Sequence, residues 1–141
     1  MFLWPVRIYY EDTDSGGVVY HANYMKFMER ARSEWLRSQG FEQDELVRRH
    51  GVIFAVRAIS LEYLRPARFN DLLQVSVSLL RRGRASLDFQ QQVLADEGAG
   101  TPAAPAAVLC SGTVKIACLD SATLRPCRLP QDLITEIASD S

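Results

Sequence analysis

RIYYEDTDSGGVVYHANY, residues 7–24, joins three predicted elements within one short segment. Residues 5–11 are rich in Val, Ile and Tyr, which predicts a first β-strand. Residues 12–17 form an acidic turn whose two adjacent glycines supply backbone freedom, and a helix is expected to begin near Ala22. Asp14 therefore lies in a loop with a helix N-terminus nearby. A carboxylate beside free backbone N–H groups is suited to chemistry on a carbonyl.

The helix that follows is the longest in the sequence and is predicted over residues 23–38. Its apolar side chains recur at spacings of three and four residues, which is the period of one helix face. This stripe comprises Tyr24, Phe27, Met28, Ala31 and Trp35. Gly40 lies where a left-handed C-terminal cap is usual. A helix with one apolar stripe must bury it, and a sheet is the surface available.

The rest of the chain is predicted to be mostly β-sheet. Strands are expected over residues 52–64, 71–80, 85–95 and 108–119, and short helices over residues 43–50 and 131–138. In residues 71–80 apolar and polar side chains alternate, as is typical of a half-buried strand. Residues 81–84 are interpreted as a turn, and residues 96–107, rich in Gly, Ala and Pro, as a flexible hairpin connection.

This element order predicts an α+β fold, with one strand, one long helix and then four strands in an antiparallel meander. The expected architecture is a curved five-stranded antiparallel sheet wrapped around the long helix, in a single domain over residues 1–141. Four residues of the strand at 85–95 share one face: Leu87, Phe89, Gln91 and Val93.

The composition argues against several classes of function. The formal net charge is −1, which gives no electrostatic basis for binding nucleic acid or an anionic membrane. No run approaches the roughly 18 apolar residues of a membrane span. Cys110, Cys118 and Cys127 form no C-x-x-C pair and are expected to be free, mostly packed thiols. Because residues 1–7 do not resemble a signal sequence, we expect a soluble, cytoplasmic protein.

Asp14 is the candidate catalytic residue. A positioned carboxylate can take a proton from water or attack an acyl carbonyl itself, so Asp14 is interpreted as a general base or a nucleophile. The alternative is that Asp12 and Asp14 are only turn residues, which hydrogen-bond their own backbone. The glycine pair, His21 and the following helix favour the catalytic interpretation, because a simple turn needs none of them.

His21 and Tyr10 are further candidates beside this turn. His21 could assist proton transfer, donate a hydrogen bond to the carbonyl or to a bound water, or only cap the helix. Tyr10 is expected in the strand, where its hydroxyl could reach the site or its ring could pack in the core. The first N–H groups of the helix have no internal partners, so they are expected to stabilise negative charge on a carbonyl oxygen.

The sequence does not support a metal site. D-x-D-x-G resembles the start of an EF-hand calcium loop, but the last position of that loop, where a bidentate Glu is required, is Asn23. The fifth position is Gly16, which offers no side-chain ligand. His21 and His50 form no H-E-x-x-H motif and the cysteines are not paired, which argues against zinc.

YYEDTDSGGVVYHANYMKFMERARSEWLR, residues 9–37, resembles the signature of the 4-hydroxybenzoyl-CoA thioesterase family of hotdog-fold enzymes. The resemblance continues through FAVRAISLEYLRPARFNDLL, residues 54–73, and covers nearly the whole chain. It is strongest to the bacterial subgroup that is encoded beside the Tol–Pal cell-envelope system. It implies a hotdog fold, in which a five-stranded antiparallel sheet wraps one long helix.

The resemblance also implies a function and a set of site residues. Family members hydrolyse acyl-CoA thioesters to the free acid and CoA, without a metal or organic cofactor. The second acid of the D-x-D motif, Asp14, would be catalytic, and the backbone N–H near His21 would polarise the thioester carbonyl. Tyr10 and His21 would line the site. Substrate contacts are also expected from Gly17, Val18 and Tyr24.

Partners follow from the same resemblance. Family members pair their sheets edge to edge into dimers, often further into tetramers, with active sites at subunit interfaces, so we expect a homodimer or homotetramer. The phosphates of CoA need cations, and several arginines lie near predicted strand ends: Arg65, Arg68, Arg81, Arg82 and Arg84. Arg81 and Arg82 are expected to bind CoA, and the alternative is that they are solvated charges that keep sheet edges apart.

Two other functions remain open at this point. The chain could be a non-catalytic or weakly catalytic hotdog protein that binds acyl carrier protein in phospholipid or envelope metabolism, since the arginines would suit an acidic carrier. A hotdog dehydratase ranks last, because His21 with Glu29 or Glu34 does not resemble the usual pair of a His base and a helical acid.

Overall fold

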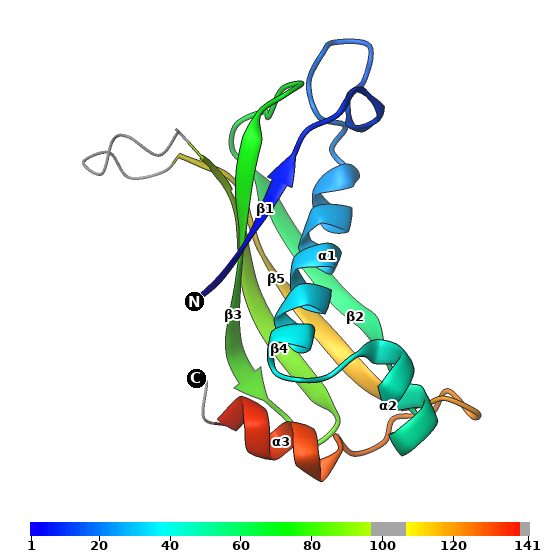
Figure 1. The fold of residues 1–141 in the computed structure, drawn as a ribbon. Helices are drawn as coiled ribbons and strands as arrows, with labels where there is room; N and C mark the ends of the chain where they lie inside the picture. Colours follow the sequence, from blue (N-terminus) through cyan, green and yellow to red (C-terminus); the bar gives the residue numbers. More distant parts are fainter. Residues whose placement is uncertain (97–106, 139–141) are drawn as a thin grey trace.

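The computed structural model describes residues 1–96 and 107–138. In chain order its elements are β1 (Phe2–Arg7), the short 3₁₀ helix η1 (Tyr10–Asp12), α1 (Asn23–Ser38), α2 (Gln43–His50), β2 (Val52–Tyr63), β3 (Leu72–Arg82), β4 (Ser86–Ala95), β5 (Val108–Asp120) and α3 (Gln131–Ala138). Figure 1 shows α1 along one face of a curved sheet, with α2 and α3 at the end opposite the loop between β1 and α1.

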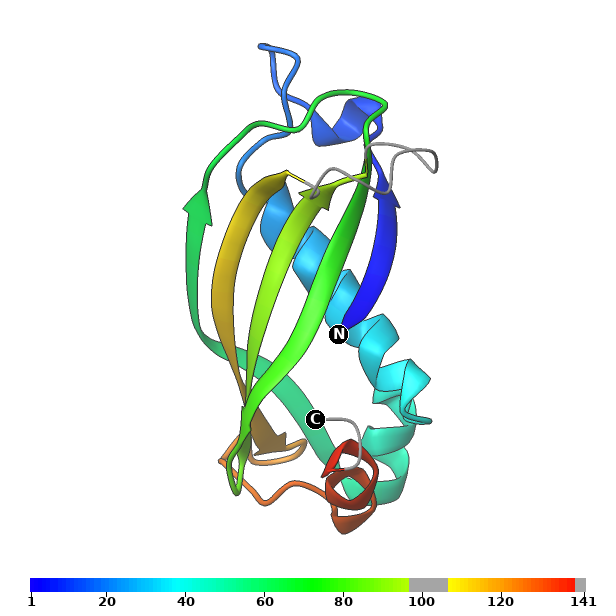
Figure 2. The ribbon, with the colours of Figure 1, turned by 90° about the vertical axis from the view of Figure 1, so that its left-hand side faces the viewer.

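The five strands form one antiparallel sheet in the order β1-β3-β4-β5-β2. The α+β class and the hotdog architecture are therefore confirmed, with α1 as the longest of the described helices. The predicted meander holds for β3, β4 and β5 only. β2 does not follow the meander, because it pairs with β5 at the far edge of the sheet. The connection from β2 to β3 crosses one end of the sheet to reach the other side (Figure 2).

The first strand lies earlier in the chain than predicted. β1 spans Phe2–Arg7 and includes Pro5, although residues 5–11 were expected. β1 is an edge strand that pairs with β3 alone, and an edge tolerates proline because its missing N–H need not face the partner. The chain then turns at η1, where the Asp12 carboxylate accepts a hydrogen bond from Tyr9 N–H at 2.9 Å. Tyr10 is therefore not a strand residue.

The predicted turn at residues 81–84 is also shorter than expected. Arg81 and Arg82 belong to β3, where they lie in register with Asp88 and Leu87 of β4. Both arginines are exposed, and exposed charged side chains do not interrupt a strand, so charge alone was a poor signal for a turn. The other predicted bounds are confirmed within two residues, except that residues 97–106 of the expected hairpin connection lie outside the described part of the chain.

The core lies between α1 and the concave face of the sheet. All five residues of the predicted stripe on α1 are buried: Tyr24, Phe27, Met28, Ala31 and Trp35. Trp35 packs edge to face against Phe89 of β4, with ring centroids 5.1 Å apart. The helix ends as predicted, since Gly40 adopts φ +93° just beyond it.

One polar side chain is fully buried in this core. Gln91 of β4 is 0% exposed. Its Nε2 donates a hydrogen bond to the carbonyl oxygen of Met28 at 3.0 Å, and its Oε1 accepts one from Arg32 Nη1 at 2.9 Å. Both polar atoms of the amide are therefore used, and the pair of bonds fixes α1 against β4.

The three cysteines are free, as predicted, and two of them, Cys110 and Cys118, are buried. Burial raises the pKa of Cys110 to about 11. None of the described helices combines the length and the apolar character that crossing a membrane would require.

Truncation of a stripe residue should destabilise the fold strongly. Phe27 is 1% exposed, so Phe27→Ala is expected to lower the free energy of unfolding by about 3–5 kcal/mol, because it removes buried ring surface and leaves a cavity. Met25 is on the same helix but 39% exposed, so the matched change Met25→Ala should cost less than about 1 kcal/mol. Urea unfolding of both variants measures this, and equal losses would show that the stripe is not the core.

Candidate functional site

The acidic loop before α1 is a tight, internally hydrogen-bonded turn. Asp14 N–H donates to the carbonyl oxygen of Val18 at 2.9 Å, and Gly17 N–H donates to the carbonyl oxygen of Asp14 at 3.1 Å. Thr13 and Val19 form an antiparallel bridge across its base. Gly17 has φ +80°, a conformation that costs a residue with a Cβ roughly 1–2 kcal/mol. The predicted turn is therefore confirmed, and its backbone favours glycine at position 17.

The Asp14 side chain is exposed at the tip of this turn. Its Oδ1 accepts a hydrogen bond from Gly16 N–H at 2.8 Å. A Cβ on Gly16 would lie 3.3 Å from that oxygen, so glycine leaves room for the carboxylate. The turn-forming role that the sequence left open is thus present. The second carboxylate oxygen makes no hydrogen bond within the described part of the chain, so it can still meet a ligand.

The segment that leads from this turn into α1 also carries backbone donors. The first two N–H groups of the helix are occupied: Asn23 N–H donates to Tyr20 O at 2.9 Å and Tyr24 N–H to His21 O at 3.4 Å. Within residues 1–96 and 107–138, the N–H groups of His21 and Ala22 have no hydrogen-bond partner. Asn23 Nδ2 also donates to the Asp12 carbonyl at 2.9 Å, which ties the turn to the helix.

His21 is exposed, and its ring contacts two tyrosines. The ring centroid lies 4.5 Å from that of Tyr20 and 6.1 Å from that of Tyr63. Tyr63 also donates its hydroxyl hydrogen to the His21 carbonyl oxygen at 3.1 Å. Tyr63 was missed by the sequence analysis, because it is 42 residues from His21 and no local pattern links the two.

Tyr24 has a structural position. Its side chain is 3% exposed, and its hydroxyl oxygen accepts a hydrogen bond from Ala67 N–H at 3.0 Å. Burial raises the pKa of Tyr24, and the bond from Ala67 opposes that rise. Tyr24 therefore joins the helix to the connection between β2 and β3. This bond holds the start of α1 in place beside the candidate site.

Tyr10 does not pack in the core, so that interpretation was wrong. Its side chain is 75% exposed, and its ring stacks on Phe69 with centroids 3.8 Å apart. Phe69 belongs to the connection between β2 and β3. The neighbouring Arg68 forms an antiparallel bridge with Val18. The turn and this connection therefore lie side by side, which places Arg68 close to the candidate site.

Arg81 and Arg82 lie at the other end of the molecule. β3 begins at Leu72 beside the turn, and nine residues of strand span about 30 Å. Arg82 Nη1 donates to the carbonyl oxygen of Ile134 in α3 at 3.2 Å. Within one chain the structure therefore does not bring these arginines to Asp14.

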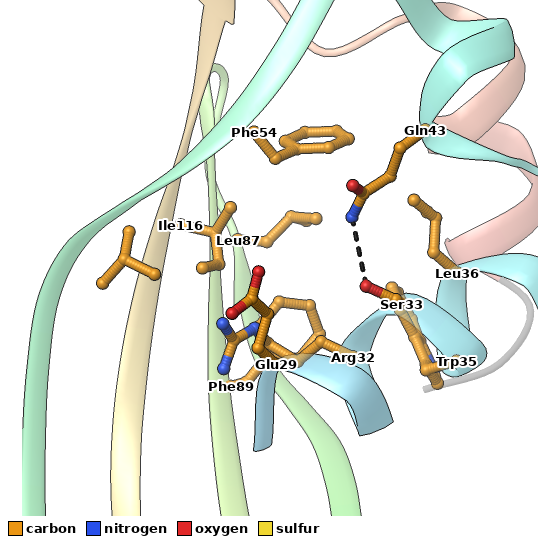
Figure 3. Close-up of a pocket in the computed structure, with 11 residues that line it drawn as sticks. Glu29, Arg32, Ser33, Trp35, Leu36, Gln43, Phe54, Leu87, Phe89 and Ile116 are labelled. Atoms are coloured by element: carbon orange, nitrogen blue, oxygen red, sulfur yellow. Dashed lines mark hydrogen bonds between the residues drawn. The ribbon is translucent and has the colours of Figure 1, made fainter. Parts of the chain in front are cut away.

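A half-enclosed pocket lies between α1 and β2, and Figure 3 shows its lining. Its volume is about 190 Å³. None of Asp14, His21 and Tyr10 lines this pocket or the three other described hollows. In the described part of the chain, no three His, Cys, Asp or Glu side chains come together in a way that could hold a metal ion.

The turn conformation predicts how Gly17 responds to substitution. A Cβ on Gly17 would meet nothing within 4 Å, so Gly17→Ala should lower the free energy of unfolding by about 1–2 kcal/mol through backbone strain alone. Gly17→Asn should lose less, since Asn tolerates positive φ better. Thermal unfolding compares the two variants, and an Ala variant as stable as the wild type would contradict the turn geometry.

Comparisons with known proteins agree with this fold. The model of the thioesterase superfamily matches residues 16–101, a segment that begins two residues after Asp14. The acyl-CoA thioester hydrolase YbgC of Escherichia coli O6:H1 is 40% identical over 96% of this chain and 95% of its own length. The acyl-CoA thioesterase YbgC of Haemophilus influenzae is 37% identical over 94% and 90%.

A solved structure gives the same result in three dimensions. The probable thioesterase from Bartonella henselae superposes with a TM-score of 0.79 at 34% identity, covering 91% of this chain and 98% of that one. Sequence and fold are thus shared along almost the entire chain. The protein therefore belongs to the thioesterase superfamily.

Proposed function

We propose that this protein hydrolyses an acyl-CoA thioester to the free acid and CoA. The relatives that are 37–40% identical along nearly the whole chain carry that activity in their names. The observation that carries the proposal for this chain is the turn before α1. Asp14 in this turn is an exposed carboxylate, and farther along the same loop the N–H groups of His21 and Ala22 have no partner in the described residues.

In this proposal Asp14 acts on the thioester carbonyl. As a general base, it takes a proton from water while the water oxygen attacks the carbonyl carbon; as a nucleophile, it attacks that carbon itself, and water then hydrolyses the resulting anhydride. In both routes the C–S bond breaks and the departing thiolate of CoA takes up a proton. The N–H groups of His21 and Ala22 donate to the carbonyl oxygen as negative charge develops on it.

The other predicted residues have supporting roles in the proposal. Gly17 holds the turn with its positive φ, and Val18 fixes it to Arg68. The exposed rings of His21 and Tyr10 flank the turn and would contact the substrate. Because Arg68 adjoins the turn, it is a better candidate for a phosphate of CoA from the same chain than Arg81 or Arg82, which would have to act from another subunit.

We propose further that two copies of the chain pair along β2. β2 pairs only with β5 among the described strands, so its outer edge is open. From Val56 onward β2 is mostly exposed and carries apolar side chains, including Val56 at 51% and Ile59 at 36% exposure. An open, apolar edge strand is a template for pairing with another chain. Tyr63, the last residue of β2, bonds to the His21 carbonyl oxygen, so such pairing would also shield this part of the candidate site from solvent.

Asp14→Asn tests the chemistry. The amide keeps an oxygen that can accept the Gly16 N–H but cannot act as a base, so kcat should fall by about 10²–10⁴-fold. The measurement is thiol release from a panel of acyl-CoAs. Asp44→Asn, which removes an exposed acid from α2, should leave the rate unchanged. Equal rates for wild type and Asp14→Asn would remove Asp14 from the mechanism, and no turnover of any thioester by the wild type would favour a carrier-binding protein.

Ile59→Lys tests the pairing. A lysine on the open edge of β2 places two like charges across a two-fold interface, so dimer affinity should fall by about tenfold or more. Leu3→Lys is the control, because Leu3 is 44% exposed on β1, at the opposite edge of the sheet. Sedimentation equilibrium measures the dimer affinity of the wild type and of both variants. A monomeric wild type, or an Ile59→Lys variant as dimeric as the wild type, would contradict pairing along β2.

A further inference from the structure

The pocket between α1 and β2, here called the α1–β2 pocket, has an apolar wall on the side of the sheet, whereas α1 contributes polar side chains together with Trp35 and Leu36. Figure 3 shows Phe54, Phe89 and Ile116 on the side of the sheet and Glu29, Arg32 and Ser33 on the side of α1. Its volume is about 190 Å³. An engineered cavity of about 150 Å³ in another protein holds one benzene molecule, so this pocket has room for a ring-sized group with a small polar substituent.

Arg32 supplies the α1 side of the pocket with a cation. Nη1 donates to the buried Gln91 at 2.9 Å, and Gln91 is itself held by the Met28 carbonyl at 3.0 Å. A guanidinium has five N–H donors, and this is its one hydrogen bond within the described part of the chain. Burial lowers the pKa of Arg32, while the Glu29 carboxylate raises it. The guanidinium is thus oriented, partly desolvated and left with unused donors that border the pocket.

No carboxylate of the described residues forms an ion pair with Arg32 within 4 Å. A partly buried cation is costly unless a hydrogen-bonded anion compensates for the lost hydration. A planar guanidinium matches a carboxylate best, because two parallel N–H groups meet its two oxygens. The apolar wall opposite would accept a hydrocarbon body but not a second charge.

We propose that the α1–β2 pocket binds a small organic acid, whose carboxylate pairs with Arg32 and whose ring-sized apolar body lies against Phe54, Phe89 and Ile116. Acids of this class are also what thioester hydrolysis releases. Binding of the acid does not depend on thioester hydrolysis, so a protein that hydrolyses no thioester would still bind it.

Glu29 sets how strongly the acid is held. It lines the same wall but is exposed to solvent, so its negative charge weakens the attraction between Arg32 and an incoming carboxylate. Its removal should therefore strengthen binding, which is the opposite of the effect of removing Arg32. Two changes with opposite signs on neighbouring residues separate a direct charge effect from general damage to the pocket.

Isothermal titration with cyclohexanecarboxylate, and with its neutral isostere cyclohexanecarboxamide, tests the proposal on the full-length wild type. The acid should bind at least about tenfold more tightly than the amide, the difference expected when a charged hydrogen bond is lost. Arg32→Met should weaken binding of the acid by about 10- to 100-fold and leave binding of the amide nearly unchanged. Glu29→Gln should strengthen binding of the acid by about two- to fivefold.

Arg30→Met is the matched control. Arg30 lies on the same helix, with its guanidinium over the Phe27 ring at 6.0 Å and outside the pocket, so the acid should bind this variant as it binds the wild type. No binding of the acid to the wild type at millimolar concentration, or equal binding of acid and amide, would overturn the proposal. If Arg32→Met does not fold, the comparison of acid with amide and the Glu29→Gln variant still decide.

Discussion

Burial of one side of α1 against the concave face of the sheet is the interaction on which the rest of this structure depends. Phe27, Met28 and Ala31 are each at most 1% exposed, and each large apolar side chain buried in this way contributes about 1.5–3 kcal/mol. The stripe fixes both the rotation of the helix and its position along the sheet. The N-terminus of α1, and with it the turn that carries Asp14, is therefore positioned by the core.

The connection between β2 and β3 holds the acidic turn against the core. It crosses the end of the sheet (Figure 2), and Ala67 in its middle bonds to the Tyr24 hydroxyl on one side and to Val19 N–H on the other. Tyr24 is a core residue, whereas Val19 follows the acidic turn. The two hydrogen bonds thus hold the turn to the same packed unit as the helix, so an exposed loop can keep a defined geometry.

Polar groups in the same interface give α1 a second role. Gln91 is buried between α1 and β4, and it holds both the backbone of the helix and the side chain of Arg32. An apolar residue at position 91 could fill the same space but would bond to neither. The helix therefore carries an acidic turn at its start and an oriented cation farther along, and the same sheet supports both.

Local pattern was enough for the elements themselves. The period of the stripe and the glycine at position 40 predicted α1 to the residue, and alternation predicted β3 and β4 closely, because helix and strand periods follow from backbone geometry over a few neighbours. The acidic turn before a helix start indicated Asp14 as the candidate site residue, and the resemblance to a family supported that interpretation. The boundary of β1 was misplaced, since Pro5 is tolerated only because β1 lies at an edge.

Pairing over long separations was decided by the tertiary structure alone. Nothing near β2 in the sequence indicates that it skips β3 to pair with β5, that Tyr63 meets His21, or that Arg81 ends far from the turn. These relations depend on how the whole sheet curves and closes over α1, which no window of neighbouring residues contains. The sequence by itself determined the apolar stripe of α1 and where the acidic turn lies. The packed sheet decided what surrounds them, and it also buries Asn23 and Leu36 of α1 outside that stripe, because contacts between distant segments form only when the core does.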